Sequence, residues 1–552
     1  MRPRRGTVFD AAPAWADPLL LAAIFGFSLF RGLGASPLLN PDEGRYAEIP
    51  REMLESGDFI TPRLNYVLYL EKPPLHYWLT ALAFRLFGET ECAVRATGAS
   101  AGLAGVLLAW GIGRRVYGRR GGMLSALVLG TSIGYLVQGR LAILDMLLAC
   151  LITASLGSFL IAAAGNGGRG DCRCYSFFFF AALAVLAKGL VGIVLPAAVV
   201  LLYAALRGRW NLLAEMRIPE GAALFILVAA PWFVAAGIRN PDFPRFFFVH
   251  EHFQRYLTTI HHRYEPFWFF VPVLAGLIFP WSCFIPAVAV RLWRRGKRLS
   301  DADLFLAIWA VLVFVFFSFS GSKLVPYILP MFPPAALLIG GTLSSVADGD
   351  FRAVRGEAFL LHAVLLGGAA ALPLYSLLAP RPAIGPSGCA AISALLLAEA
   401  LIIGACRRRA DTAGLLLGLC LMTYIEGVVG PQFVLAGIQR RRSTKELAAA
   451  IAGAARPGDA VVAFSAYPHD LPFYLKRRVT LVGDTGDLEF GSAHGDQSRW
   501  FIDERTFYGW WDSPGRLFVL AYEDDAAAIG KTVRTPMKIL GRKGKMLAIT
   551  NR

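Results

Sequence analysis

Charged residues are scarce in this sequence. Asp, Glu, Lys and Arg make up 17% of the 552 residues, whereas a soluble globular protein carries about a quarter. Hydrophobic residues make up 56% and the mean hydropathy is +0.52, which excludes an ordinary soluble protein. Segments of about ten alternating apolar and polar residues, the pattern of a membrane β-barrel, do not recur. The composition therefore indicates a helical membrane protein.

Paired cysteine motifs are also lacking. The eight cysteines are scattered, and the lone Cys172-x-Cys174 has no Cys-x-x-Cys partner. This excludes a cysteine-based zinc module and gives no disulfide framework. The basic segment 1–5 precedes an apolar run without a small-residue cleavage pattern, so we expect a retained first span and not a removed signal peptide.

Positive charge is in excess, with a formal net charge of +16. The arginines nevertheless fall in short clusters between apolar runs, as in the cytoplasmic loops of membrane proteins. No segment resembles a folded basic module, so we do not expect nucleic-acid binding.

Apolar runs long enough to cross a bilayer recur along most of the chain, and they predict about thirteen spans. A shorter run, 73–88, opens with Pro73-Pro74 and contains His76 and Trp78, so we interpret it, like the acidic helix expected over 42–56, as lying in the membrane interface. The predicted spans are 18–34, 92–112, 121–138, 141–164, 177–187, 189–206, 221–237, 267–290, 303–320, 324–346, 357–379, 387–405 and 412–430.

The basic clusters occupy every second connection, which the positive-inside rule places in the cytoplasm. The outer connections then include 35–91, 238–266 and everything after residue 431. We predict a transmembrane catalytic domain over 1–431 and a small outer α/β domain over 432–552, with strands at 460–464 and 517–521 and a helix at 444–454. Arg440–Arg442 depart from the charge rule, but a domain of this size can cross regardless of charge.

Most ionisable residues outside the basic clusters map to outer connections or to outer ends of spans. Charges at membrane depth are costly and are functional candidates by default. Their convergence predicts one polar cavity, in which Lys and Arg would hold a phosphate and a carboxylate would orient or deprotonate an acceptor or stabilise an oxocarbenium-like sugar. The residues are Asp42, Glu43, Glu71, Lys72, Asp145, Lys188, His250, Glu251, His252, Arg255, His261, His262, Arg263 and Lys323.

Structural explanations for these residues stay open. Acids favour the positive end of a helix dipole, and lysines between apolar runs can extend to the interface. The first explanation applies to Asp42 and Glu43, the second to Lys188; Asp145 could cap a helix, Glu71-Lys72 could anchor an interfacial segment, and His261 and His262 could be surface residues.

Five motifs carry a resemblance to a known family. They are "NPDEGRYAEIPREMLESGDFITPRLNYVLYLEKPPLHYWL", "RLAILDMLL", "LAKGL", "FFFVHEHFQRY…HHRYEPFWFF" and "SKLVPYILPMFPP". Together they resemble the bacterial members of the glycosyltransferase C superfamily, above all the aminoarabinose transferases that modify lipid A, which are related to protein O-mannosyltransferases. The resemblance covers the membrane part and is strongest between Asn40 and Pro334.

The resemblance implies about thirteen spans, interfacial helices and a periplasmic catalytic cavity in the bacterial inner membrane. The expected donor is 4-amino-4-deoxy-L-arabinose on undecaprenyl phosphate and the acceptor is a lipid A phosphate. The residues implied are Asp42 and Asp145 as catalytic carboxylates; Lys72 and Arg255 on the carrier phosphate; Lys323 and Tyr327 near it; Lys188, Glu43, Tyr69 and Arg45 as further substrate contacts; and Glu71 and His252 near a zinc position. The sequence alone supplies no complete zinc ligand set, and no other cofactor is expected.

A lipid A phosphate is already an anion, so Asp42 would mainly position the acceptor or the 4-amino group. With a Ser or Thr acceptor, Asp42 would be a general base. Another sugar or acceptor, such as a protein hydroxyl, is the alternative within enzymes. A lipid or solute transporter is the alternative of another class, but the two matching halves typical of many transporters are not found.

Overall fold

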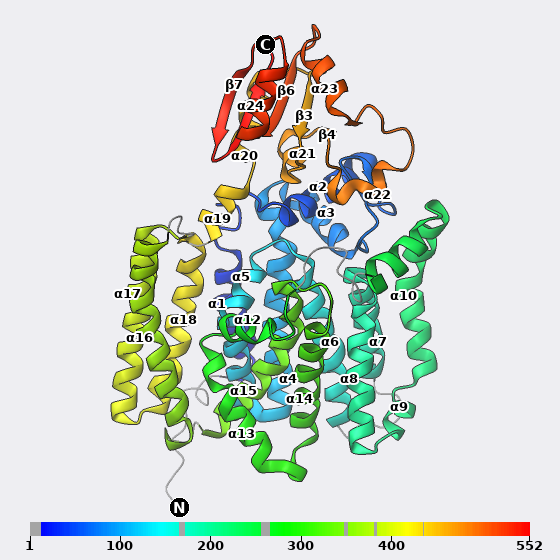
Figure 1. The fold of residues 1–552 in the computed structure, drawn as a ribbon. Coiled ribbons are helices and arrows are strands. Elements are labelled where there is room, and N and C mark those ends of the chain that lie inside the picture. Colours follow the sequence, from blue (N-terminus) through cyan, green and yellow to red (C-terminus); the bar gives the residue numbers. More distant parts are fainter. Residues whose placement is uncertain (1–12, 165–171, 255–264, 347–350, 380–383, 434) are drawn as a thin grey trace, which may run out of the picture. The chain divides into compact units, whose positions relative to one another are not determined.

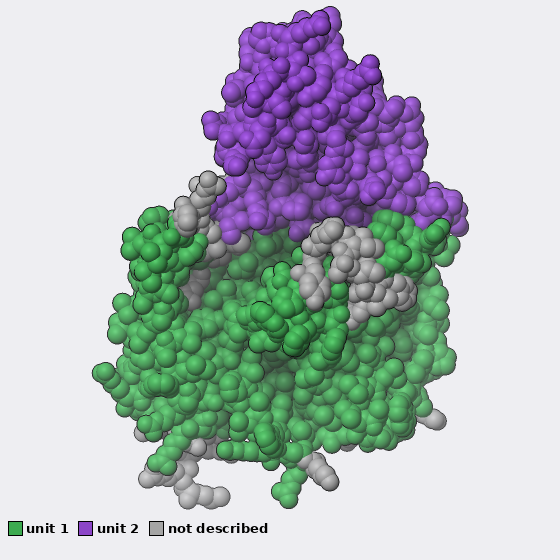
Figure 2. All heavy atoms as spheres, viewed as in Figure 1, with its two compact units in different colours: residues 1–31, 98–237, 244–434 green, residues 32–97, 238–243, 435–552 purple. Residues whose placement is uncertain are grey.

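The computed structural model describes residues 13–164, 172–254, 265–346, 351–379, 384–433 and 435–552 (Figure 1). The chain forms two compact units, coloured separately in Figure 2. Unit 1 comprises residues 1–31, 98–237 and 244–434, and unit 2 comprises 32–97, 238–243 and 435–552.

Unit 1 consists of helices, and each predicted apolar run coincides with one or more of them. Its elements, in whole or in large part, are α1 (Ala16–Phe30), α4 (Glu91–Thr131), α5 (Ile133–Gly139), α6 (Leu144–Ala164), α7 (Cys172–Lys188), α8 (Val191–Arg207), α9 (Asn211–Glu215), α10 (Ile218–Arg239), η2 (Arg245–Gln254), α12 (Phe270–Leu277), η3 (Trp281–Phe284), α13 (Ile285–Arg295), η4 (Gly296–Arg298), α14 (Asp301–Ser318), η5 (Val325–Met331), α15 (Phe332–Val346), η6 (Phe351–Val354), α16 (Arg355–Leu378), α17 (Pro386–Arg409) and α18 (Thr412–Phe433).

The described residues contain eight helices long and apolar enough to cross a membrane, or nine if the bent pair Phe270–Leu277 and Trp281–Arg295 is one span. Three further apolar helices, Ala16–Phe30, Cys174–Lys188 and Val191–Arg207, are shorter. The 41-residue α4 has non-helical backbone at Gly118, where φ is 78°, so it contains two helical segments. The predicted total of about thirteen spans is reached only if the bent pair counts as one span, the three shorter helices also count, and α4 counts as two. The chain is a multi-pass helical membrane protein, as predicted.

Two predicted spans are interrupted. The run 267–290 is not one straight helix, because its two halves meet at an angle of 108°. Pro280 lies at the break, where it removes a backbone donor and its ring prevents a continuous helix. The run 121–138 is divided at Ser132, whose backbone is extended between α4 and α5.

The first part of unit 2 contains the two predicted interfacial helices, and a short hairpin that was not predicted lies between them. They are α2 (Asp42–Ser56), with the predicted bounds, and α3 (Leu75–Phe87). Between them lie β1 (Arg63–Leu64) and β2 (Val67–Leu68). The turn residues Asn65 and Tyr66 have φ of 53° and 63°. Two successive positive φ values are what a tight type I′ hairpin turn requires.

The second part of unit 2 is a six-stranded sheet with helices, as predicted for the C-terminal region. The strand order is β5-β4-β3-β6-β8-β7; β5, β4, β3 and β6 are parallel, and β8 pairs antiparallel with both β6 and β7. Its elements are α19 (Leu435–Arg442), α20 (Lys445–Ala454), β3 (Ala460–Phe464), α21 (Asp470–Leu475), β4 (Thr480–Val482), η7 (Gly486–Leu488), α22 (Glu489–Ser492), β5 (Phe501–Ile502), α23 (Glu504–Trp511), β6 (Leu517–Tyr522), α24 (Glu523–Thr532), β7 (Lys538–Lys543) and β8 (Met546–Thr550).

Apolar side chains of the central strands and of α23 form the core of this sheet. Val462, Val519, Phe507 and Trp511 are completely buried in one cluster. Continuous apolar strands such as β3 are expected where a parallel sheet is covered on both faces.

Helix α2 packs closely on α21 within unit 2. A Cβ atom at Gly44 would lie 2.4 Å from the backbone nitrogen of Asp470. Only glycine allows this approach, so the region around the candidate residue Asp42 is built together with the C-terminal sheet. The predicted boundary at residue 431 stays a prediction.

Candidate active site

The predicted site residues fall into two groups, one in each unit. Arg255 lies outside the described residues, and of His252 only the backbone position in η2 is described. Unit 1 holds Asp145, Lys188, Lys323 and Tyr327, and unit 2 holds Asp42, Glu43, Arg45, Tyr69, Glu71 and Lys72.

In unit 1, three predicted residues from three elements lie together. Asp145 is in the first turn of α6 and Lys188 is the last residue of α7. The Lys188 Nζ donates a hydrogen bond to Asp145 Oδ1, and the two side chains are 14% and 11% exposed. The same Nζ lies 4.5 Å from the centroid of the Tyr327 ring of η5, a cation–π contact. Lys188 is therefore held as a cation by a carboxylate and an aromatic face.

Lys323 lies in the loop before η5. Its Nζ donates to the backbone carbonyls of Glu265 and Ser320, at 2.8 Å each. The pKa of Lys323 is lowered, because the effect of burial exceeds the opposite effect of the nearby Glu265 carboxylate. Lys323 thus ties the loop before η5 to the carbonyls of Glu265 and Ser320.

In unit 2, the adjacent acids Asp42 and Glu43 have different surroundings. Asp42 is exposed in the first turn of α2, whereas Glu43 is completely buried. The Nε and Nη2 atoms of Arg95 donate to the two carboxylate oxygens of Glu43, both at 2.8 Å. The backbone N–H of Leu39 donates to the same carboxylate at 2.8 Å. Glu43 thus fastens the loop before α2, and Asp42 is the accessible acid of the pair.

Arg45 joins another part of the predicted set. Its Nη2 pairs with Asp487, and its guanidinium carbon lies 5.6 Å from the centroid of the Tyr69 ring. Burial opposes the charge of Arg45, yet its pKa is raised because Tyr69, Asp487 and Glu71 favour the cation. Burial also raises the pKa of Tyr69, so its hydroxyl stays neutral. Arg45 is therefore a permanent cation beside Tyr69 and Glu71.

Lys72 follows Glu71 in the loop between β2 and α3. Both residues are half-buried, and the Lys72 Nζ donates to the Glu71 carbonyl at 2.9 Å. This loop precedes Pro73-Pro74, which begin the approach to α3.

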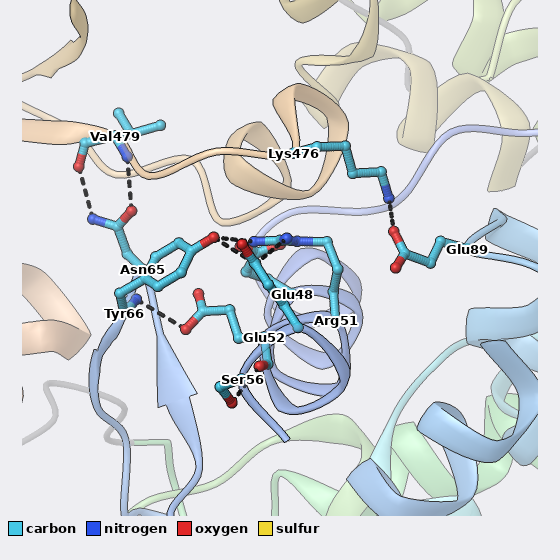
Figure 3. Close-up of polar contacts among 10 residues, drawn as sticks. Glu48, Arg51, Glu52, Ser56, Asn65, Tyr66, Glu89, Lys476 and Val479 are labelled. Atoms are coloured by element: carbon cyan, nitrogen blue, oxygen red, sulfur yellow. Dashed lines mark hydrogen bonds and ion pairs between the residues drawn. The ribbon is translucent and has the colours of Figure 1, made fainter. Parts of the chain in front are cut away.

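A polar network stabilises α2 and the hairpin, as Figure 3 shows. Arg51 binds Glu48 with two hydrogen bonds of 2.7 and 2.6 Å. The Tyr66 N–H donates to Glu52 at 2.9 Å, which ties the hairpin turn to the helix. Asn65 exchanges two hydrogen bonds with the backbone of Val479, at 2.8 and 2.9 Å. The hairpin turn is thereby tied to α2 and to the segment that leads into β4.

Sequence reasoning missed three residues of this region. Arg95 could have been found as an arginine inside a predicted span, and Asp487 carried no signal. His76 of α3 is completely buried against Tyr46, with ring centroids 5.4 Å apart. Burial lowers the pKa of His76 to about 4, so this imidazole is neutral at neutral pH.

Comparisons with known proteins match this architecture. Residues 38–247 match the family described as dolichyl-phosphate-mannose-protein mannosyltransferase, and residues 447–551 match the aminoarabinose transferase C-terminal domain. An undecaprenyl phosphate-alpha-4-amino-4-deoxy-L-arabinose arabinosyl transferase of Pseudomonas fluorescens is 30% identical over 515 residues, which are 90% of each chain. The chain belongs to the aminoarabinose transferase family. The predicted membership of the glycosyltransferase C superfamily is confirmed.

Other family members align over shorter stretches. The arabinosyl transferase of Edwardsiella ictaluri is 33% identical over 356 residues, so this chain spans 64% of that relative's length. Among solved structures, ArnT from Cupriavidus metallidurans bound to undecaprenyl phosphate has a TM-score of 0.86 at 29% identity, covering 98% of this chain and 99% of that one. The archaeal oligosaccharyltransferase AglB from Archaeoglobus fulgidus, at 14% identity and a TM-score of 0.55 over 96% of this chain and 72% of that one, shares the fold.

The predicted zinc position is unconfirmed. Among the described residues, no group of three or more His, Cys, Asp and Glu side chains could hold a metal ion. Glu71 lies near the cations Arg45 and Lys72, a poor setting for a divalent ion.

Proposed function

We propose that this aminoarabinose transferase moves 4-amino-4-deoxy-L-arabinose from undecaprenyl phosphate to a lipid A phosphate. The observation that carries the proposal is the alignment with an arabinosyl transferase of that name over 90% of both chains. The likeness to a transferase structure that holds undecaprenyl phosphate supports the donor. The reaction would take place on the periplasmic face of the inner membrane, between a lipid-linked sugar donor and a lipid acceptor.

On the donor side, the carrier phosphate is the leaving group. The bond between the anomeric carbon and the carrier oxygen breaks, and the phosphate departs with the electron pair. Lys72 and Arg255 would neutralise its charge, which is the largest electrostatic change of the reaction. Lys188, which contacts Asp145 and Tyr327, would be a further cation that binds the substrate.

On the acceptor side, an ionised phosphate oxygen of lipid A forms the new bond to the anomeric carbon. No proton has to be removed, so a strong base is unnecessary. Asp42, exposed at the start of α2, would orient the acceptor or bind the 4-ammonium group of the sugar. Direct displacement with inversion follows, because no second nucleophilic carboxylate is required.

A second candidate function is supported by the match of residues 38–247 to the protein mannosyltransferase family. The same donor chemistry would then serve a Ser or Thr hydroxyl of a protein. Such an acceptor must lose a proton, and Asp42 would act as its general base.

The test is sugar transfer by the purified protein in lipid nanodiscs. Undecaprenyl-phosphate aminoarabinose and lipid A are supplied, and the product is identified by mass spectrometry. A hexose donor and a Ser/Thr peptide acceptor are run in parallel. Glycosylated lipid A with no glycopeptide supports the leading proposal, and the reverse result supports the second one. In cells, loss of the gene should increase polymyxin susceptibility, since unmodified lipid A is more anionic.

A further inference from the structure

The sheet of unit 2 reverses its strand order beside β3. From β3 the chain continues to β4 and then β5 on one side, and it returns to β6 on the other side, with all four strands parallel. In open α/β sheets, ligands bind beyond the carboxyl ends of the strands at such a reversal. A ligand site is therefore expected beyond the carboxyl ends of β3 and β6.

A cavity of about 400 Å³ lies there. The segment 466–469 that follows β3, Tyr522 at the end of β6 and the turn 543–546 between β7 and β8 form its walls, together with 441–443 and 40–41. The N–H of Glu523 donates to the carbonyl of Lys545 at 2.8 Å, which fixes the turn to the end of β6. The volume suits a single phosphorylated sugar.

The lining is strongly basic. Arg441, Arg442, Lys543 and Lys545 contribute to it, and no Asp or Glu belongs to the lining. Lys543 Nζ lies 3.2 Å from Glu446, which lies outside the lining. Arg441 and Arg442 are two of the three arginines that depart from the positive-inside rule, and a bound anion would explain why the chain carries them here.

The cavity also touches the segment that leads into the candidate active site. Asn40 and Pro41 line it and directly precede Asp42. The Asn40 side chain donates to the Arg442 carbonyl at 3.0 Å and accepts from the Asp470 N–H at 3.0 Å. A ligand in the cavity would therefore contact the segment that positions Asp42.

We infer that this basic pocket binds a sugar phosphate of the acceptor glycolipid, at a phosphate group that does not itself react. The inference rests on the proposed function and adds a second anchoring point for its acceptor. Arginine binds phosphate through paired hydrogen bonds, and lysine adds charge. A lipid A disaccharide carries such sugar phosphates, whereas an anionic phospholipid offers a phosphodiester without a sugar.

The first test measures binding to the full chain in phosphatidylcholine nanodiscs. The probe is a deacylated lipid A disaccharide with two phosphates, compared with its phosphate-free form. We expect Arg442→Ala and Lys545→Ala each to weaken binding about tenfold, the scale of one charge-assisted hydrogen bond. Lys545→Arg should restore it. Lys531→Ala is the matched control, because Lys531 is exposed on α24 and outside the lining.

Three results would overturn the inference. They are unchanged binding by the Arg442→Ala/Lys545→Ala double variant, equal binding of the phosphate-free disaccharide, and equally strong competition by phosphatidylglycerol vesicles. Thermal unfolding of each variant must match the wild type, so that lost binding is not lost folding.

The second test separates this inference from the proposed function. In the transfer assay, the double variant should raise the KM for lipid A about tenfold or more while kcat and the affinity for undecaprenyl phosphate change little. A KM equal to that of the wild type would contradict the pocket. A wild-type protein that transfers no sugar would refute the proposed function, and the binding measurement would still decide the pocket.

Discussion

Glu43 and Arg95 form a completely buried ion pair with two hydrogen bonds of 2.8 Å, although Glu43 directly follows the exposed Asp42. Two adjacent acids thus have separate roles. Glu43 holds the loop before α2 through Arg95, which also donates to the carbonyls of Ser36 and Pro37 at 2.8 Å each. Asp42 is left at the surface of the same helix turn. This difference can be tested residue by residue.

Asp42→Asn should reduce sugar transfer by about a hundredfold or more, since the acceptor or the sugar amine loses its charged contact. The side chain is exposed, so the melting temperature should stay near that of the wild type. Transfer is measured by mass spectrometry of lipid A, and stability by a thermal scan in detergent. Wild-type turnover by Asp42→Asn would remove Asp42 from the site.

Glu43→Ala should act on folding instead. It leaves the Arg95 guanidinium buried without its carboxylate, which costs about 3–5 kcal/mol in comparable buried pairs. We expect a lower melting temperature and less protein in the membrane fraction. The double variant Glu43→Ala/Arg95→Met is the control, because it removes both charges and should recover part of the loss. A stable but inactive Glu43→Ala protein would instead favour a substrate contact.

The cation at Lys188 should be essential for donor use. Lys188→Met keeps the length of the side chain but removes the charge that Asp145 and Tyr327 hold. Transfer should fall by about a hundredfold, as when one preorganised donor is lost. Tyr327→Phe keeps the aromatic face and should lose at most about threefold, whereas Tyr327→Ala should lose more. Equally large losses in the two Tyr327 variants would show that the hydroxyl, and not the ring, matters.

Local signals predicted much of the fold. Helix α2 has the predicted bounds because both of its ends carry local signals. Asp42 and Glu43 lie in its first turn, and Gly57, in the left-handed conformation, follows its last residue. The bend between α12 and η3 was missed, because the apolar run continues across Pro280 and hydropathy does not register a break. Strands β3 and β6 were predicted from their apolar sequences, but nothing local indicates that they adjoin.

The candidate site was predictable in its residue types but not in its pairings. The partner of Glu43 is 52 residues away, and that of Arg45 is 442 residues away. The first pair joins α2 to the start of α4, and the second joins α2 to the C-terminal region, both within unit 2. Asp145 and Lys188 lie in different helices, and only the fold brings their side chains together.

Gly44 should be intolerant of any side chain. A Cβ there would lie 2.4 Å from the Asp470 nitrogen, so α2 and α21 would have to separate. We expect Gly44→Ala to destabilise unit 2 by about 1–3 kcal/mol, as overpacking does. Gly509→Ala in α23 is the matched control, because open space surrounds that position and alanine favours a helix. An unchanged melting temperature for Gly44→Ala would contradict the close packing.

His76 should make stability depend on pH. Burial lowers its pKa from 6.5 to about 4 in the folded protein. Between these values the unfolded chain binds the proton and the folded protein does not, so this contribution to stability is complete above pH 6.5 and is lost as the pH falls toward 4. The slope for one such group is about 1.4 kcal/mol per pH unit.

His76→Gln removes this titration while keeping a polar side chain of similar size. We therefore compare melting temperatures of the two proteins from pH 7.5 to 4.5, because other acids titrate equally in both. The difference should be constant above about pH 6.5 and should shift in favour of the variant as the pH falls, since only the wild type has to keep a buried imidazole unprotonated. A difference that stays constant over the whole range would mean that His76 is protonated as readily in the folded protein as in the unfolded chain.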